Sequence, residues 1–532
     1  MADDSHLVRS FNWKDVFPFV AIFRGFRIAI HPSKLVLALV ALMLVYAGGS
    51  FLDVIWPSSQ QAVADEISKY EASRNNLDPD ASFDALRRQQ IEAEVAQRKA
   101  ALAAIGKPDG DIGDLKWKIL QDRDAAVKAA EADYEKSPGP AGETMRQFEI
   151  KAAYDDARAA IDQLEGARTG LFLTFRTYEL GQINSIVRGV RAGNFMGPDG
   201  ITISLVRLFS TGPSWALRPN HALFFLIYGI YFLTIWSVFG GAITRIAAVH
   251  FARDEKISIR QALAFSTSKF LSFVSAPVIP MLIIVAVGLL LTAGGLLLYI
   301  PILGPIVVGA FFFIALAAGF VMTLVLLGLA GGFNLMYPTI AVEGSDSFDA
   351  ISRSFSYLYA RPWRLGFYTA VAIAYGALTY LFVRYFIYIL LSLIHLFLGM
   401  LVFSHSASLA PLLQTLWPSP HSIGRLSYEI DWTSLSAGES IGAVLISIWV
   451  YLAVYMLGAF TISFYFSVSA IIYYLMRQEV DATELDDVYL EQTDEDFAET
   501  PAGVSPTPES TDSATPEVTA TIITQGTPPA TA

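Results

Sequence analysis

The chain has 532 residues, of which 54% are hydrophobic and 13% aromatic, and its formal net charge at pH 7 is -12. It contains no cysteine, which excludes disulfides, thiolate metal sites and cysteine nucleophiles. Because the apolar residues are concentrated in blocks, the composition indicates a polytopic membrane protein with soluble parts.

The charges divide the chain into parts of opposite sign. Residues 57–169 carry 22 acids and 16 bases, and residues 478–532 carry 13 acids and no base. The rest, which holds the apolar blocks, has an excess of bases. The membrane part is therefore the basic part of the chain.

The N-terminal region is expected to be a retained membrane anchor. Residues 1–34 should form a cytoplasmic segment with an amphipathic helix, and residues 35–55 the first transmembrane span. Trp56-Pro57 follows this span in place of a small-residue cleavage site, so it does not read as a removable signal.

Residues 56–221 are predicted to form an extracytoplasmic helical insertion. Breaks at residues 106–111 and 137–141 separate helices with apolar stripes, which suits an antiparallel bundle or coiled coil projecting roughly 35–40 Å. Residues 171–190 should return as an amphipathic helix along the outer surface. Residues 61–168 are the expected contact with a protein partner, although a bundle that packs only on itself fits the pattern equally well.

Residues 222–477 are predicted to be a transmembrane bundle, with the most apolar stretch in the middle. Residues 270–342 contain no Asp, Glu, Lys, Arg or His, and the stretch is interrupted only near Pro301 and Pro305. A span takes roughly 20 apolar residues, so this stretch reads as two spans joined by a tight hairpin. The six predicted spans are residues 35–55, 222–243, 272–298, 303–330, 365–390 and 441–474.

The stretch 365–403 is almost twice as long as one span and contains a single base, Arg384. Either Arg384 caps a hairpin of two spans, or one span ends near it and continues as an extension to about Leu401. The single span is preferred because it keeps the C-terminus on the side that Arg477 predicts. In this reading Arg384 is a boundary charge that extends to the membrane surface.

The positive-inside rule orients the chain with both termini in the cytoplasm of a bacterial inner membrane. The bases that carry this prediction flank one end of the spans: Arg9, Lys14, Arg24, Arg27, Lys34, Arg245, Arg253, Lys256, Arg260, Lys269, Arg353, Arg361, Arg364 and Arg477.

A similar element precedes three of the spans, which suggests three units of amphipathic helix plus hairpin. Residues 21–26, 258–263 and 347–355 share short patterns, and Gly240-Gly241 and Gly331-Gly332 end the preceding spans. The helix at 347–358 carries one apolar stripe and is expected to lie in the membrane interface, mainly to orient the next span. Paired glycines favour close helix packing.

The tail, residues 478–532, is acidic and rich in Thr, Ser and Pro, which predicts a disordered cytoplasmic segment. Such a composition buries too little apolar surface to fold. The alternative is that the tail docks on a basic partner or on the protein's own basic face.

Catalytic and metal-binding patterns are weak throughout. Residues 438–442 fit G-x-S-x-G around Ser440, but a polar loop precedes them where the motif needs a strand, and Ser436 reads better as a helix cap. The seven histidines show no zinc spacing. No catalytic, cofactor or metal residue is assigned, and no nucleic-acid contact is expected. The only acid inside a predicted span is Asp53, near the end of the first one, and this scarcity disfavours ion-driven transport.

The chain resembles uncharacterised bacterial six-span membrane proteins. The shared features are a span that ends in Gly-Gly, a basic loop, an amphipathic helix that begins with Ser, and a following span that begins with Pro. The chain is more distantly similar to the membrane domain that accompanies some glycerophosphodiester phosphodiesterases. The resemblance covers residues 222–390 and extends to residues 15–55, with no counterpart of the catalytic domain, so it implies architecture and no activity.

The sequence favours an all-α, non-enzymatic membrane protein that organises or regulates partners through its insertion and tail. The alternative is a transporter or flippase for lipid or a hydrophobic solute without ion coupling. A membrane-embedded esterase at Ser440 is the third hypothesis.

Overall fold

The computed structural model describes residues 17–57, 60–63, 65–74, 83–136, 138–166, 168–197, 200–400, 412–420, 426, 428, 430, 435 and 437–489. Residues up to Val488 form one compact unit. The tail was predicted to be disordered from residue 478, and this start is wrong, because α19 continues to Asp481 and Val488 is buried. The predicted tail after Tyr489 lies outside the described residues.

The described chain is mostly helical, and six of its helices are long and apolar enough to cross a membrane. Each overlaps a predicted span, and α11, α15, α17 and α19 extend beyond the predicted C-terminal bound. They are α3 (Pro32–Ile55), α11 (Pro219–Arg253), α13 (Phe270–Leu296), α15 (Phe312–Glu343), α17 (Pro362–Gly399) and α19 (Ala437–Asp481).

The remaining elements are short or belong to the insertion. Before the first span lie η1 (Pro18–Phe23) and α2 (Arg24–Ala29). The insertion contains β1 (Ala62–Val63), α4 (Glu66–Arg74), α5 (Phe83–Ala104), α6 (Ile112–Lys136), α7 (Pro140–Gly166), β2 (Arg168–Thr169), α8 (Leu171–Ala192), α9 (Ile201–Val206), the π-helical η4 (Arg207–Thr211) and α10 (Gly212–Ala216). Between the later spans lie α12 (Ile259–Ser268), η5 (Leu297–Tyr299), α14 (Leu303–Ala310), α16 (Ser347–Ala360) and α18 (Leu412–Leu416).

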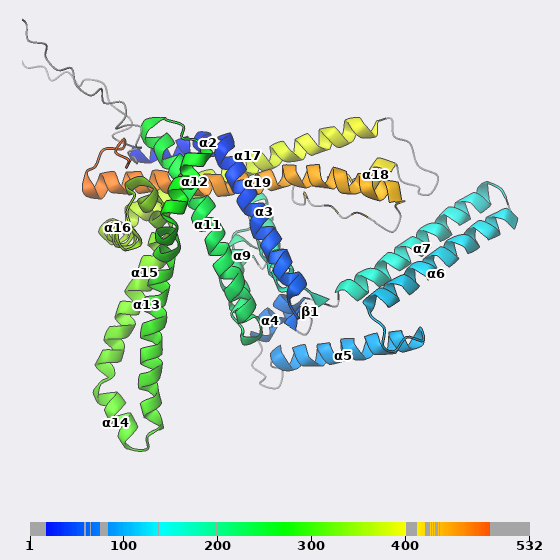
Figure 1. The fold of residues 1–532 in the computed structure, drawn as a ribbon, viewed down its shortest axis with the longest axis horizontal. Coiled ribbons are helices and arrows are strands. Elements are labelled where there is room, and N and C mark those ends of the chain that lie inside the picture. Colours follow the sequence, from blue (N-terminus) through cyan, green and yellow to red (C-terminus); the bar gives the residue numbers. More distant parts are fainter. Residues whose placement is uncertain are drawn as a thin grey trace, which may run out of the picture. The chain divides into compact units, whose positions relative to one another are not determined.

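Consecutive long helices contact one another, α3 with α11, α13 with α15, and α17 with α19, and α19 also packs on α3, α11 and α15. Figure 1 shows α13 and α15 side by side, with α14 at the far end. Ile302 turns the chain there with a φ of +68°, and Leu303 N–H donates to the Pro301 carbonyl at 2.7 Å. The fourth span therefore begins at Phe312 after the separate helix α14, and not at residue 303 as predicted.

One helix, α17, runs through Arg384 to Gly399 without a break. The chain therefore forms no hairpin at Arg384, and this part of the prediction is confirmed. The extension is a direct continuation of the same helix, because nothing in the sequence up to Gly399 interrupts its apolar helical pattern.

The two breaks predicted in the insertion are confirmed between α5 and α6 and between α6 and α7. The helices α6 and α7 pack side by side over about 38 Å, given 1.5 Å per residue. Leu115 and Ala130 are buried between them, and the guanidinium groups of Arg123 and Arg146 lie over tyrosine rings of the opposite helix. Whether this pair is a coiled coil stays a prediction.

The most deeply buried part of the described chain lies where three spans end together. The C-terminal ends of α11, α15 and α19 contact one another there, and α12, α16 and α2 pack on them in that order. We call this region the hub; it comprises residues 24–29, 240–251, 259–268, 335–342, 347–360 and 463–476.

Glycines allow the short helices to approach the spans in the hub. A Cβ on Gly241 would lie 2.3 Å from Ser266 Oγ, and one on Gly331 would lie 2.8 Å from the Leu358 side chain. Because both distances are far below van der Waals contact, these positions require glycine for packing. The predicted role of the paired glycines is confirmed.

The apolar stripe of α16 packs mostly inside the protein. Phe355 and Leu358 lie on Gly328 and Gly331 of α15, while Phe348 remains 69% exposed. Whether α16 lies in the membrane interface and orients the next span stays a prediction.

Candidate functional site

The structure contains a groove of about 570 Å³ whose walls come from four helices. The groove is lined by Ile183, Ile186, Val187 and Val190 of α8, Asn334 and Leu335 of α15, Leu365, Thr369, Ala372, Ile373, Gly376, Ala377, Tyr380 and Leu381 of α17, and Phe460, Thr461, Phe464, Tyr465, Val468, Ser469 and Ile472 of α19. None of these side chains carries a charge. The surface offered to a ligand is therefore almost entirely apolar.

Helical periodicity in the sequence builds each wall. On α8 the four lining residues are spaced as i, i+3, i+4 and i+7, which places them on one face. The lining residues of α17 and α19 repeat every three or four positions in the same way. Gly376 lets α19 come close, because a Cβ there would lie 2.7 Å from the ring of Phe464.

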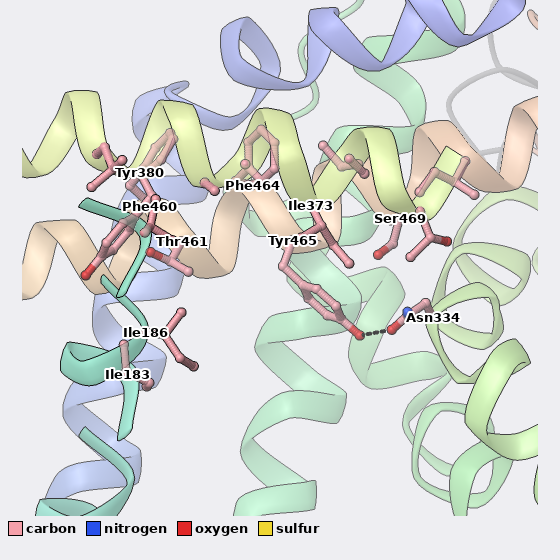
Figure 2. A pocket seen from close by; sticks show the side chains of 18 of the residues that line it. Ile183, Ile186, Asn334, Ile373, Tyr380, Phe460, Thr461, Phe464, Tyr465 and Ser469 are labelled. Carbon is pink, nitrogen blue, oxygen red and sulfur yellow. Dashed lines mark hydrogen bonds between the residues drawn. The ribbon is translucent and has the colours of Figure 1, made fainter. Parts of the chain in front are cut away.

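The few polar groups of the groove are neutral. Tyr465 donates its hydroxyl hydrogen to Asn334 Oδ1 at 2.7 Å, as Figure 2 shows. Thr461 and Ser469 also line the wall, and the Thr461 hydroxyl donates to the Leu457 carbonyl at 2.9 Å. A ligand thus meets a few neutral hydroxyl and amide groups, some near Asn334 and some near Tyr380 and Thr461, in a wall that is otherwise hydrocarbon.

The wall formed by α8 is attached to the first span. The Asp53 carboxylate at the end of α3 accepts the backbone N–H groups of Phe172 and Leu173, each at 2.9 Å. This caps the free N–H groups at the start of α8. The Arg176 guanidinium lies over the ring of Tyr46, 4.7 Å from its centroid. Through these contacts α8 lies against α3, a position that its amphipathic pattern did not reveal.

Arg384 joins α8 to α17. Its guanidinium donates to Tyr380 Oη at 2.7 Å and to Asn184 Oδ1 at 3.3 Å. The residue is only 4% exposed. The expectation of a boundary charge extending to the membrane surface is therefore wrong, because α8 supplies a polar partner within the protein.

A second buried polar cluster lies in the insertion and is largely satisfied by its own members. Glu66 Oε1 accepts from Arg87 Nε and Trp215 Nε1, both at 3.2 Å, and His221 Nε2 lies 3.3 Å away. Glu66 Oε2 accepts the Val63 N–H at 2.7 Å. These contacts hold α4, α5 and the start of α11 together, which gives the cluster a structural role.

Glu179 on α8 is an unusual carboxylate. Its Oε1 atom is buried without a hydrogen-bond partner in the described part of the chain, and it lies against the backbone of Gly212. Burial raises the pKa of Glu179 to about 7. This group therefore titrates near neutral pH.

Ser440 lies in the first turns of α19, within a continuous helix from Ala437. Ser436, the predicted cap, lies outside the described residues. Among the described residues there is no group of three or more His, Asp or Glu side chains able to hold a metal ion.

The groove was not predicted from the sequence, although part of its signal was present. The spacing of the α8 isoleucines and valines marks an apolar face, and similar faces run along α17 and α19. Which faces meet depends on the capping contact of Asp53, which lies more than 100 positions from α8 in the chain.

Comparison with protein-family models, with curated proteins and with solved structures finds no match to this chain.

Proposed function

We propose that this protein binds a lipid acyl chain, or a hydrophobic solute of similar shape, in the groove between α8, α15, α17 and α19. The observation that carries the proposal is the uncharged lining of a groove of about 570 Å³. Ligand sites typically measure roughly 300–1,000 Å³ and are lined mainly by apolar side chains. The stretch of α17 from Leu365 to Leu381 is about 24 Å long at 1.5 Å per residue, which suits an extended hydrocarbon chain.

The proposed role is lipid handling without ion coupling. Acids that couple transport to protons or cations face the interior of a bundle or a water-filled cavity. The lining residues include none, so movement of a lipid through the groove would be passive.

Labelling with a photoactivatable fatty acid tests the groove. Purified protein in a non-ionic detergent is irradiated with the probe, and the labelled residues are mapped by mass spectrometry. We expect labels on the groove faces of α17 and α19, and Ala377→Trp should reduce them severalfold by filling the space. Ala374→Trp on the same helix is the matched control, because residue 374 does not line the groove. Equal labelling of both variants at these positions would refute the proposal.

A second candidate function is a scaffold that binds a protein through the insertion. It is favoured by large apolar side chains exposed on the α6–α7 pair: Trp117 is 59%, Met145 56% and Phe148 67% exposed. Adjacent exposed apolar residues mark contact surfaces, and Met145 and Phe148 lie one turn apart on α7. A photo-crosslinking amino acid at position 117 in native membranes should capture a protein, whereas the same group at the charged position 122 should not. Capture of lipid alone would remove this candidate.

We also propose that the bundle consists of three related units, each a short helix followed by a hairpin arm. The contacts support this arrangement, since α12 packs on α11, α16 on α15, and α2 on α19. Each short helix is followed directly by the next long span. Exchange of the α12 and α16 sequences should leave a folded protein if the units are equivalent, and unfolding of the exchanged protein in detergent would argue against it.

The proposed orientation places the hub in the cytoplasm and the insertion outside the inner membrane. The absence of native cysteine makes this easy to test with introduced thiols. A membrane-impermeant maleimide added to intact spheroplasts should label Asp109→Cys and should leave Ser258→Cys unlabelled until the membrane is broken. The reverse pattern would invert the topology.

A further inference from the structure

Lys34, in the first turn of α3, is fully buried, and its Nζ atom has no hydrogen-bond partner. No ion pair reaches it from the described residues. A buried ammonium group that lacks an acceptor is strongly unfavourable, and buried charges in proteins are therefore paired with a counter-charge. Burial lowers the pKa of Lys34 to about 7, and none of the described residues supplies a counter-charge, so an anion bound beside the amine would hold it in its charged form.

Two histidines lie beside Lys34. The rings of His31 and His250 are 5.7 Å apart between centroids, and the charges of Lys34, His31 and Arg27 act on the His250 ring. Burial, followed by the charges of Lys34 and Lys256, lowers the pKa of His31. The three side chains therefore form a compact group of nitrogen atoms whose charged neighbours are mostly basic.

The acidic and polar partners of this group are few in the described chain. Asp254 Oδ1 lies 3.6 Å from His250 Nε2, beyond a normal hydrogen bond, and the Asp254 side chain is 62% exposed. His31 Nδ1 shares a hydrogen bond of 2.7 Å with Ser33 Oγ. His31 is only half-buried, so the group reaches the protein surface at that residue.

The surroundings of His31 combine apolar and basic side chains. Ile30, which precedes His31 in the chain, is 43% exposed, and Val36, on the next turn of α3, is 50% exposed, which suits contact with acyl chains. The side chains of Arg27, Arg253 and Lys256 are exposed nearby. Apolar side chains next to bases at the end of a span are typical of the level of lipid headgroups.

We propose that Lys34, His31 and His250 form a binding site for a phosphate oxyanion at the hub end of α3. The two possible sources of this group are the headgroup of a membrane lipid and free phosphate, and the exposed apolar residues around His31 favour the lipid. The site is separate from the groove and does not depend on it.

Thermal unfolding of the full chain in a non-ionic detergent tests the site with three probes. These are short-chain phosphatidylglycerol, the diacylglycerol with the same acyl chains, and inorganic phosphate. We expect phosphatidylglycerol to raise the unfolding midpoint of the wild-type protein, because a ligand that binds only the folded state stabilises it. Diacylglycerol should not do so. A matching rise with inorganic phosphate would identify the free anion as the ligand, and no rise with either phosphate probe would overturn the proposal.

Two substitutions at position 34 distinguish a loss of phosphate binding from a change in the basal stability of the protein. Lys34→Met should unfold at a higher temperature than the wild type without added probe, because the unpaired charge is gone, and it should lose the response to phosphate. Lys34→Arg should retain the response. Lys269→Met removes a base at the start of α13 and should respond like the wild type. A full response in Lys34→Met would refute the assignment, whatever its effect on basal stability.

Discussion

Glu343 at the end of α15 and Arg477 in α19 form an ion pair in which Oε1 and Nε are 3.3 Å apart. Their side chains are only 10% and 12% exposed. Arg353 of α16 joins the same carboxylate at 2.9 Å, and the Tyr473 hydroxyl donates to it. One carboxylate thus connects three helices of the hub.

Replacing Glu343 by Gln should destabilise the hub strongly. Two arginines would lose their shared counter-charge, but Arg477 keeps Asp487 and Arg353 keeps Asp349, so the cost is about 1–3 kcal/mol, below that of an isolated buried pair. The free energy of unfolding in detergent, measured with denaturant, should fall by that order. Glu255→Gln in the exposed loop after α11 is the control and should change little. An equal effect of both substitutions would contradict the role of Glu343.

Gly241→Val should displace α12 from α11. The new side chain would overlap Ser266 and Phe273, and overpacking of this kind costs about 1–3 kcal/mol. Gly229→Val on the same helix is the matched control, because a Cβ there meets nothing within 4 Å. Thermal unfolding should separate the two variants clearly, and similar midpoints would show that the α11–α12 contact is not close-packed.

Glu179 should make stability depend on pH. Its pKa is near 4.5 in an unfolded chain and about 7 in the fold, so the folded state binds more protons between these values. Stability therefore falls as pH rises from about 4.5 to about 7 and then levels off. Glu179→Gln should flatten this part of the curve and raise the unfolding midpoint at pH 8. Glu131→Gln on α6 should keep the wild-type slope, and an unchanged slope in Glu179→Gln would exclude the assignment.

Asp53→Ala should loosen α8 and the groove together. Loss of the cap leaves two backbone N–H groups of α8 without their acceptor, at a cost of about 0.5–2 kcal/mol. We expect earlier proteolysis within residues 171–192 and weaker fatty-acid labelling of α17. Asp65→Ala, elsewhere in the insertion, serves as the comparison. If α8 is cleaved earlier but the labelling of α17 is unchanged, the groove does not depend on the position of α8.

The spans were predictable because each depends on local composition. Between Phe270 and Val342 the absence of charge fixes both membrane helices, and the break around Pro301 fixes their hairpin. Arg384 shows the limit of such reasoning. Its burial depends on Asn184, which lies 200 positions earlier in the chain. No periodicity reveals a hydrogen bond between such distant residues.

The same limit applies to the groove and to Lys34. The stripe Ile183, Ile186, Val187 and Val190 predicts an apolar face but not the helix that it meets. Lys34 reads in the sequence as one of many bases at the end of a span. Only packing against α11 and α19 shows that, unlike its neighbours, it is withdrawn from solvent.

The length of α19 has a mechanical consequence. It contains no proline from Ala437 to Asp481, and its 45 residues extend for about 67 Å. The stretch Phe460–Ile472 carries groove residues, while Tyr473 and Arg477 hold the Glu343 contacts on the next turns. Because these segments belong to one uninterrupted rod, a ligand that tilts the groove wall must also shift the arginine that binds Glu343. Binding in the groove and the geometry of the Glu343–Arg477 ion pair are therefore coupled through α19.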